Sequence, residues 1–205
     1  MEIKKFGNAI NQQPTTDNRQ QNTMTIETTP IQDLLIINPT VFEDARGYFF
    51  EAYNQNTLAA QGINIHFVQD NQSFSKRGTL RGLHYQNPPY AQTKLIRVLQ
   101  GEIMDICVDI RKQSPTYGQH FAIKLSAENK KQLLIPHGFA HGFSVISETA
   151  IVMYKCDQFY NKASEGGIRF DDPSLNIDWG MDLKDAIVSD KDLVLPGIEK
   201  CNSEF

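Results

Sequence analysis

The sequence predicts an all-β protein, a jelly-roll antiparallel β-barrel with a few short helices. From Ile26 onward, short apolar or alternating segments are separated at close intervals by Gly, Pro, Asn and Asp, which is typical of sandwiches and barrels. Helical periodicity is scarce, so a long sheet must pack on another sheet or close on itself to hide its edges. A small barrel leaves an open mouth lined by inward polar residues, and a ligand pocket is expected there.

The N-terminal part differs from the rest of the chain. Residues 1–24 are polar and rich in Asn, Gln and Thr, so they lack the apolar surface that would offset the entropy of ordering. We therefore expect a flexible N-terminal extension over residues 1–24 and a single barrel domain over residues 25–205. A chain of 205 residues is long enough for one such domain to bury its own core.

One helix and one strand are the clearest local elements. Residues Gln55–Ala60 favour a short helix, with Asn54 as its N-cap and Gly62 as the residue after its C-cap. Residues Ile103–Ile110 alternate, which predicts a strand with Met104 and the other even-numbered side chains on one face and the odd-numbered ones on the other.

Chain-neighbouring strands are expected to pair as hairpins. Residues Leu95–Leu99 precede the strand Ile103–Ile110 across a short link that contains Gly101. In the same way, Phe139–Ile146 precede Thr149–Cys156. Both pairs favour antiparallel hairpins and a mostly antiparallel sheet.

The composition excludes some classes of protein. A net charge of -4 and a pI near 5.7 give no broad basic surface for nucleic acid. No apolar stretch reaches ~18 residues and no signal peptide is recognisable, so we expect no membrane partner. Cys107, Cys156 and Cys201 are odd in number and widely spaced, which favours a cytoplasmic protein with reduced thiols, and we expect Cys107 and Cys156 to pack in the core.

The densest run of candidate catalytic and binding residues is Arg81-Gly82-Leu83-His84-Tyr85-Gln86, followed by Lys94. In a strand, His84 shares a face with Gly82 and Gln86, whereas Leu83 and Tyr85 take the other. Spacing alone leaves open whether His84 is functional or a structural histidine with satisfied hydrogen bonds.

Five ordered motifs make the chain resemble a known family. They are Gln69–Ser73, Arg81–Gln86, Gly101–Arg111, Leu125–Lys130 and Ile135–Phe143. Together they resemble the dTDP-4-dehydrorhamnose 3,5-epimerase family, and the likeness extends from about Ile26 to Asp192. It implies a cupin-type barrel without cofactor or metal, and a homodimer in which strands of one subunit complete the other's pocket. The implied reaction epimerises dTDP-4-keto-6-deoxyglucose at C3 and C5 to dTDP-4-keto-L-rhamnose.

The resemblance also implies roles for individual residues. His84 is the base, Lys94 lies by the C4 oxygen, Tyr154 delivers a proton on the opposite face, and Asp192 orients the imidazole. Without the resemblance, Asp192 would be interpreted as a solvated charge near the C-terminus. Each binding residue, taken singly, would be interpreted as a surface ion, a structural hydrogen-bonding group or a turn cap. The implied substrate-binding residues are Arg46, Glu51, Gln69, Asp70, Asn71, Arg81, His141, Glu165 and Lys191.

The sequence leaves three alternatives open. Family members often carry two adjacent tyrosines shortly after the position of Tyr154, whereas this chain has Phe159-Tyr160, so a single-site 3- or 5-epimerase is one alternative. A metal-dependent cupin is another, because Pro136-x-Gly138-x-x-His141 resembles a metal-ligand motif, although His84 lacks the nearby second histidine that such a site needs. The third is a binding barrel that has lost turnover.

Overall fold

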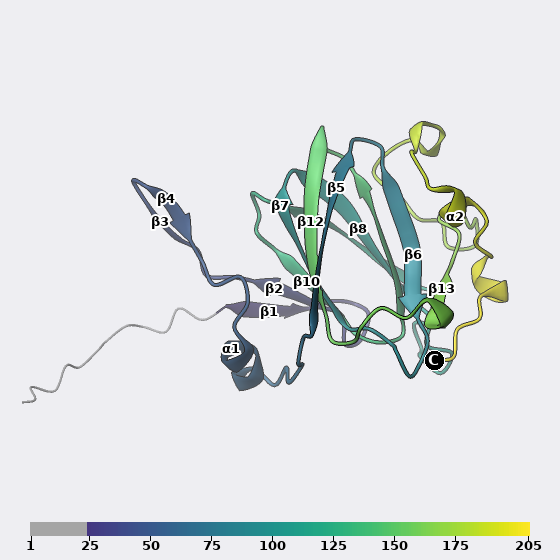
Figure 1. Ribbon diagram of the computed structural model, residues 1–205, viewed down its shortest axis with the longest axis horizontal. Helices are drawn as coiled ribbons and strands as arrows, with labels where there is room; N and C mark the ends of the chain where they lie inside the picture. Colours follow the sequence, from purple (N-terminus) through teal and green to yellow (C-terminus); the bar gives the residue numbers. More distant parts are fainter. Residues whose placement is uncertain (1–23) are drawn as a thin grey trace, which may run out of the picture.

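The computed structural model describes residues 24–205 (Figure 1). The predicted extension therefore lies outside the described residues except for Met24, which is buried next to the first strand. Two large sheets form the body of the protein. The six-stranded sheet has the order β1 (Thr25–Thr28), β2 (Leu35–Asn38), β10 (Gln132–Ile135), β7 (Lys94–Gln100), β12 (Thr149–Cys156) and β5 (Gln69–Lys76).

The five-stranded sheet has the order β13 (Glu165–Gly167), β6 (Leu80–Gln86), β11 (Phe139–Val145), β8 (Glu102–Asp109) and β9 (His120–Ser126). A separate hairpin of β3 (Phe42–Asp44) and β4 (Gly47–Phe49) projects away from both sheets (Figure 1). Every pairing between these strands is antiparallel. The predicted all-β jelly-roll barrel is confirmed.

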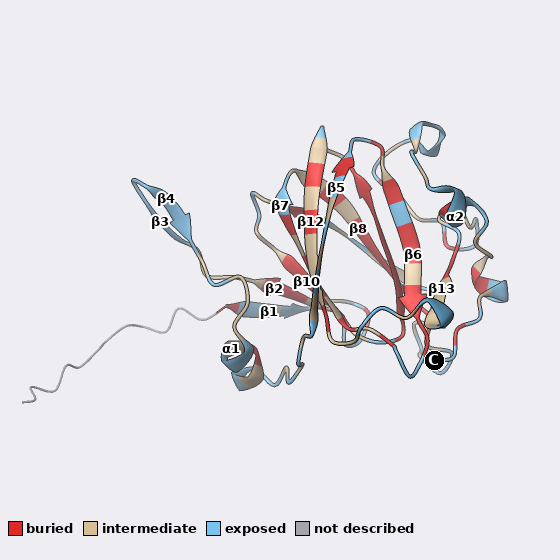
Figure 2. Cartoon of the chain, viewed as in Figure 1, coloured by how far each residue is buried: buried red, intermediate tan, exposed pale blue. Residues whose placement is uncertain are grey.

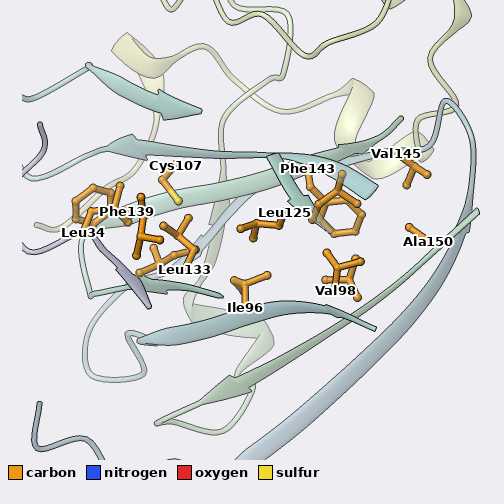
Figure 3. Close-up of a cluster of buried hydrophobic side chains, with 14 of the residues drawn as sticks. Leu34, Ile96, Val98, Cys107, Leu125, Leu133, Phe139, Phe143, Val145 and Ala150 are labelled. Carbon is orange, nitrogen blue, oxygen red and sulfur yellow. The ribbon is translucent and has the colours of Figure 1, made fainter. Parts of the chain in front are cut away.

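Apolar side chains from both sheets meet between them and form the main core (Figure 3). Ile96 and Val98 of β7 face Cys107 of β8 and Phe143 of β11 in this layer. The C-terminal segment covers the outer face of the five-stranded sheet, where Trp179 is 1% exposed. The space between the sheets is therefore filled by apolar side chains at one end and lined by polar side chains at the other.

The two hairpins expected from the sequence are wrong. Strand β7 pairs with β10 and β12, whereas β8 pairs with β9 and β11, so the link at Gly101 crosses from one sheet to the other. The link between β11 and β12 crosses in the same way. Each strand has apolar residues to bury in the inner layer, and crossing between sheets places consecutive strands on opposite sides of that layer.

The helices in the described part of the chain are short. They are α1 (Gln55–Ala60), α2 (Asp190–Leu193) and the 3-10 turns η1 (Lys162–Ser164), η2 (Leu183–Asp185) and η3 (Ile198–Lys200). Helix α1 has the predicted bounds, and Asn54 Oδ1 accepts hydrogen bonds from the backbone N–H groups of Asn56 and Thr57, as an N-cap should. Gly62 follows the C-cap with a φ of +85°. No helix within residues 24–205 has the length and apolarity needed to cross a membrane.

The predicted faces of β8 are confirmed, but both are buried. Ile106 and Val108 pack under the C-terminal segment, while Cys107 points into the core between the sheets. Cys107 and Cys156 are each 0% exposed, as expected of core residues. Because β8 is covered on both sides, its polar Asp105 is also fully buried and needs a partner.

We expect Gly101→Ala to destabilise the fold strongly. Gly101 has a φ of +77°, and a Cβ there would overlap the carbonyl oxygen of Thr149 at the turn that crosses between sheets. Strain of this kind costs about 2 kcal/mol, or roughly 4–8 °C in Tm for a chain of this size. Thermal unfolding measures it, with Gly62→Ala as the matched control, because Gly62 also has a positive φ but open space around it. Equal losses in the two variants would contradict the role of the overlap.

Candidate active site

A pocket of about 500 Å³ opens between the two sheets, at the end of the inner layer where polar side chains replace the apolar core. Strands β5, β7 and β12 supply one wall, strands β6 and β11 the other, and the segment around α2 closes the side. Seven of the residues singled out in the sequence line this one cavity: Arg81, His84, Lys94, His141, Tyr154, Lys191 and Asp192. Its volume lies within the range of small-molecule sites.

His84 and Asp192 form a hydrogen-bonded pair in this pocket. His84 points inward from β6, because its neighbours Leu83 and Tyr85 pack on the outer face, as predicted. Its Nε2 lies 2.6 Å from Asp192 Oδ1. The backbone N–H of Gly82 donates to the second oxygen of Asp192, and Ser189 caps the helix that carries the aspartate.

The charge on Asp192 settles which nitrogen of His84 is free. Burial opposes ionisation of this carboxyl, but hydrogen bonds from His84 and the backbone of Gly82 outweigh it and lower the pKa of Asp192. An ionised Asp192 only accepts hydrogen bonds, so Nε2 of His84 carries the N–H that donates to it and Nδ1 carries the lone pair. Nδ1 forms no hydrogen bond with any residue of the described chain and is available to take a proton from a ligand.

Lys94 and Tyr154 lie on the opposite wall. Burial lowers the pKa of Lys94, against the opposing influence of Cys156 and other nearby groups, and its ammonium forms no ion pair or hydrogen bond within residues 24–205. Burial also raises the pKa of Tyr154, so its phenol stays protonated. The pocket thus presents a lysine amine and a neutral acid on the six-stranded sheet, facing a histidine on the five-stranded sheet.

A second histidine pair lies beside the first. His141 of β11 is paired in register with His84 of β6, and its Nε2 lies 2.9 and 3.0 Å from the two oxygens of Asp105. Sequence reasoning missed Asp105 as the partner of His141. The burial of Asp105 appears only in the structure, where a fully buried carboxylate must find a charged or multiply donating neighbour.

The rim of the pocket carries further charges. Lys191 Nζ lies 2.5 Å from Glu165 Oε1, and the hydroxyl of Tyr160 donates to the other oxygen of Glu165. Arg81 Nε donates to Ser75 Oγ across the two sheets at 3.1 Å. Phe159, the position where family members often have tyrosine, is 61% exposed.

The remaining predicted residues divide into two groups. Gln69 and Asn71 lie on the inward face of β5, hydrogen-bonded to each other, and Asn71 is paired in register with Tyr154. Asp70 points outward and pairs with Lys155.

Arg46 and Glu51 lie away from the pocket within one chain. Arg46 is at the tip of the projecting hairpin, with a 90% exposed side chain paired to Asp44. Glu51 follows the hairpin, is exposed and accepts a hydrogen bond from Asn54.

The described residues provide no ligand set for a metal. Within residues 24–205, no three His, Cys, Asp or Glu side chains lie close enough together to hold an ion. His84 and His141 face each other in register, but each is committed through Nε2 to its own aspartate.

An antiparallel barrel with a histidine–aspartate pair, a half-buried lysine and a half-buried tyrosine in one cavity is an enzyme scaffold for proton transfer. Residues 28–200 match the family described as dTDP-4-dehydrorhamnose 3,5-epimerase, and the chain belongs to this family. The dTDP-4-dehydrorhamnose 3,5-epimerase of Shigella flexneri is 52% identical over 171 residues, which are 83% of this chain and 93% of that protein.

Solved structures agree. The dTDP-4-dehydrorhamnose 3,5-epimerase of Elizabethkingia anophelis has a TM-score of 0.82 and 51% identity, covering 86% of this chain and 97% of that one. The dTDP-6-deoxy-D-glucose-3,5-epimerase of Legionella pneumophila, solved in complex with dTDP-4-keto-L-rhamnose, has a TM-score of 0.83 and 45% identity, covering 86% and 94%.

Proposed function

We propose that this chain epimerises dTDP-4-keto-6-deoxy-D-glucose at C3 and C5 and yields dTDP-4-keto-L-rhamnose. The C4 ketone acidifies the hydrogens on both neighbouring carbons. In each half-reaction, His84 Nδ1 takes a proton from carbon, and the electron pair moves onto the C4 oxygen as an enolate. A proton returned from Tyr154 to the other face of that carbon restores the ketone with inverted configuration.

The observation that carries this proposal is the position of base and acid on opposite walls. His84 projects from β6 of one sheet, and Tyr154 projects from β12 of the other, into the same pocket. Inversion requires removal of a proton on one face and its return on the opposite face. A ring bound between the two sheets would present one face to each residue.

Stabilisation of the enolate falls to Lys94. The pKa values of the carbon acid and of the imidazolium differ by more than about ten units. At about 1.36 kcal/mol per unit, the proton transfer is uphill by more than roughly 14 kcal/mol. An ammonium fixed in a site that excludes most water stabilises the enolate oxygen without having to reorganise. Electrostatic stabilisation of this kind is usually the largest single contribution to catalysis. The half-buried side chain of Lys94 lines the pocket without an ion pair or hydrogen bond to residues 24–205, which supports this role.

The cations at the rim support binding of the diphosphate. Arg81 and Lys191 line the same pocket as His84, and the guanidinium fork suits phosphate oxygens. Gln69, Asn71, His141 and Glu165 are proposed to contact the sugar or nucleotide. This is supported by His141 in the pocket lining, by the pairing of Asn71 with Tyr154, and by the contact of Glu165 with Lys191 at the rim. Asp70 faces outward within one chain, so its proposed contact with the substrate depends on a partner or on rearrangement.

A homodimer is the second part of the proposal. The hairpin β3–β4 stands away from its own barrel with all six strand residues exposed, including Phe42 at 54% and Phe49 at 67% (Figure 2). Large exposed aromatics on a projecting hairpin favour burial against another chain. In a dimer with exchanged strands, the hairpin would bring Arg46 to the partner's pocket. Sedimentation of the full chain tests this, and a monomeric mass would contradict it.

The location of the protein is proposed from its cysteines. All three are free thiols, two of them in the core, which suits a reducing compartment such as the cytoplasm. The barrel of residues 25–205 is proposed to act as one catalytic domain.

Deuterium exchange tests the function directly. The full chain, freed of metal with a chelator, is incubated with dTDP-4-keto-6-deoxyglucose in heavy water, and NMR follows C3 and C5 separately. Exchange and inversion at both carbons are expected. Exchange at one carbon would favour a single-site epimerase, for which the phenylalanine at position 159 is the specific observation. No exchange would contradict the proposal.

We expect Tyr154→Phe to slow product formation more than it slows the entry of deuterium. His84 still removes the carbon proton and exchanges it with solvent, but the neutral acid on the far face is lost, at a cost of about 10²-fold or more in turnover. The NMR assay above reports both rates. Tyr117→Phe, at a tyrosine outside the pocket, serves as the control. Equal slowing of both processes would count against an acid at Tyr154.

A further inference from the structure

One hydroxyl in the pocket has no partner in the protein. Ser73 of β5 lines the cavity, and its Oγ is shielded from solvent without a hydrogen bond to any residue in the range 24–205. Ser75, two residues further along the same face, is different, because its Oγ accepts from Arg81 Nε at 3.1 Å. The one other buried polar atom of the described chain without a partner, Gln132 Oε1, belongs to a residue that does not line this pocket.

The register places Ser73 beside Tyr154. Strand β5 pairs with β12 so that Ser73 lies opposite Val152 and Asn71 opposite Tyr154. Paired residues share a face, so Ser73 and Tyr154 are diagonal neighbours on the inward side, a separation of roughly 7–8 Å between backbones. Ser73 therefore faces the part of the pocket where the proposed acid meets the reacting ring.

A shielded hydroxyl without a partner is unfavourable for the free protein. Buried polar groups nearly always find a hydrogen bond, and exceptions concentrate where function requires them. An apolar or smaller residue would fit this position at less cost, as Val152 does across the ladder. A sugar ring carries oxygens on every side, and a serine hydroxyl can donate to one of them.

We infer that Ser73 is a substrate-contacting residue whose hydroxyl donates a hydrogen bond to an oxygen of the bound 4-keto sugar. The inference rests on the proposed function, since it takes the sugar as the ligand of this wall. The hydroxyl makes no hydrogen bond within residues 24–205, so it can turn about χ1 toward the substrate without breaking one. The contact adds a neutral donor on the wall that also carries Lys94 and Tyr154.

Ser73→Ala tests the inference by separating activity from stability. Its kcat/KM is expected to fall about ten-fold or more, the effect of losing one hydrogen bond to substrate. Its Tm should be unchanged or higher, because the substitution removes a shielded polar atom and breaks no bond within the protein. Epimerisation of dTDP-4-keto-6-deoxyglucose and thermal unfolding of the full chain give the two readouts.

Ser126→Ala is the matched control and should show the opposite pattern. Ser126 is buried at the end of β9, outside the pocket, and its Oγ accepts from the backbone N–H of Asn129 at 2.9 Å. Its loss should lower Tm and leave kcat/KM as in the unaltered chain. Ser73→Cys, which keeps the size of the side chain but is a weak donor, should behave like Ser73→Ala.

Two results would overturn the inference. One is a Ser73→Ala variant with the kcat/KM of the unaltered chain. The other is a loss of activity accompanied by a matching loss of Tm, which would make the hydroxyl structural. If the unaltered chain itself fails to epimerise the sugar, the proposed function fails instead, so the two failures are distinguishable in one assay.

Discussion

Replacing His84 with alanine is expected to lower kcat by about 10³-fold, within the range of 10² to 10⁴ that a positioned general base contributes. The physical reason is the free Nδ1, which Asp192 fixes as the acceptor because its Oδ1 lies 2.6 Å from Nε2 and accepts the hydrogen bond from Nε2–H. Deuterium entry at C3 and C5 should stop together with product formation, because both begin with removal of a carbon proton. Binding of dTDP should persist, since Arg81 and Lys191, the residues proposed to hold its phosphates, are unchanged. Isothermal calorimetry and NMR measure the two effects.

His137→Ala is the matched control for this experiment. His137 is also paired with a carboxylate, with its Nε2 3.0 Å from Asp157 Oδ2, but it lies outside the pocket and is 46% exposed. Turnover should be unchanged there. Asp192→Asn should retain the packing around His84 but lose the charge that selects the tautomer of His84. Its loss of kcat should be smaller than that of His84→Ala and larger than that of His137→Ala. Normal exchange in His84→Ala would remove this histidine as the base.

The local features of the fold were accessible from the sequence because their causes are local. The bounds of α1 follow from Asn54 and Gly62, which act within a few residues of their own positions. The alternating faces of β8 follow from the geometry of a strand, and the inward orientation of His84 follows from the burial of Leu83 on the other side. Each of these predictions needed only the neighbours of the residue along the chain.

The partners of each strand were not accessible in this way. The sequence around Gly101 is compatible with a tight hairpin, and only the shared inner layer decides that β7 and β8 lie in different sheets. The same reasoning applies to the buried pair of Asp105 and His141, which are 36 residues apart in sequence. Asp192 joins His84 across 108 residues, and only the resemblance to a family pointed to it before the geometry did.

Two predicted binding residues illustrate a different limit. Arg46 and Glu51 lie on or next to a hairpin that is fully exposed in one chain, so a single chain cannot bring them to the pocket that holds His84. Motif resemblance carries over the residues of a site without stating which subunit supplies them. The projecting hairpin and its exposed aromatics are the observations on which the proposed homodimer rests.

Lys94→Met is expected to lower kcat by about 10²–10³-fold, as the loss of a preorganised group at an oxyanion does, with a smaller effect on KM. The difference arises because the C4 oxygen carries full negative charge only after proton removal, so the ammonium contributes most in the transition state. Methionine preserves the length and apolar stem of the side chain. The measurement is steady-state epimerisation together with deuterium entry, which should slow equally because both pass through the enolate.

The same substitution should leave the fold as stable as before or more stable. Burial lowers the pKa of Lys94, which means that the folded protein disfavours its charged form, and no hydrogen bond or ion pair of the described residues is lost when the ammonium is removed. Lys124→Met, at a lysine whose side chain is 61% exposed on β9, should change neither kcat nor Tm. A Lys94→Met variant that loses Tm in proportion to kcat would show that the ammonium supports the fold. A loss of kcat at an unchanged or higher Tm would show that the ammonium acts by stabilising the enolate.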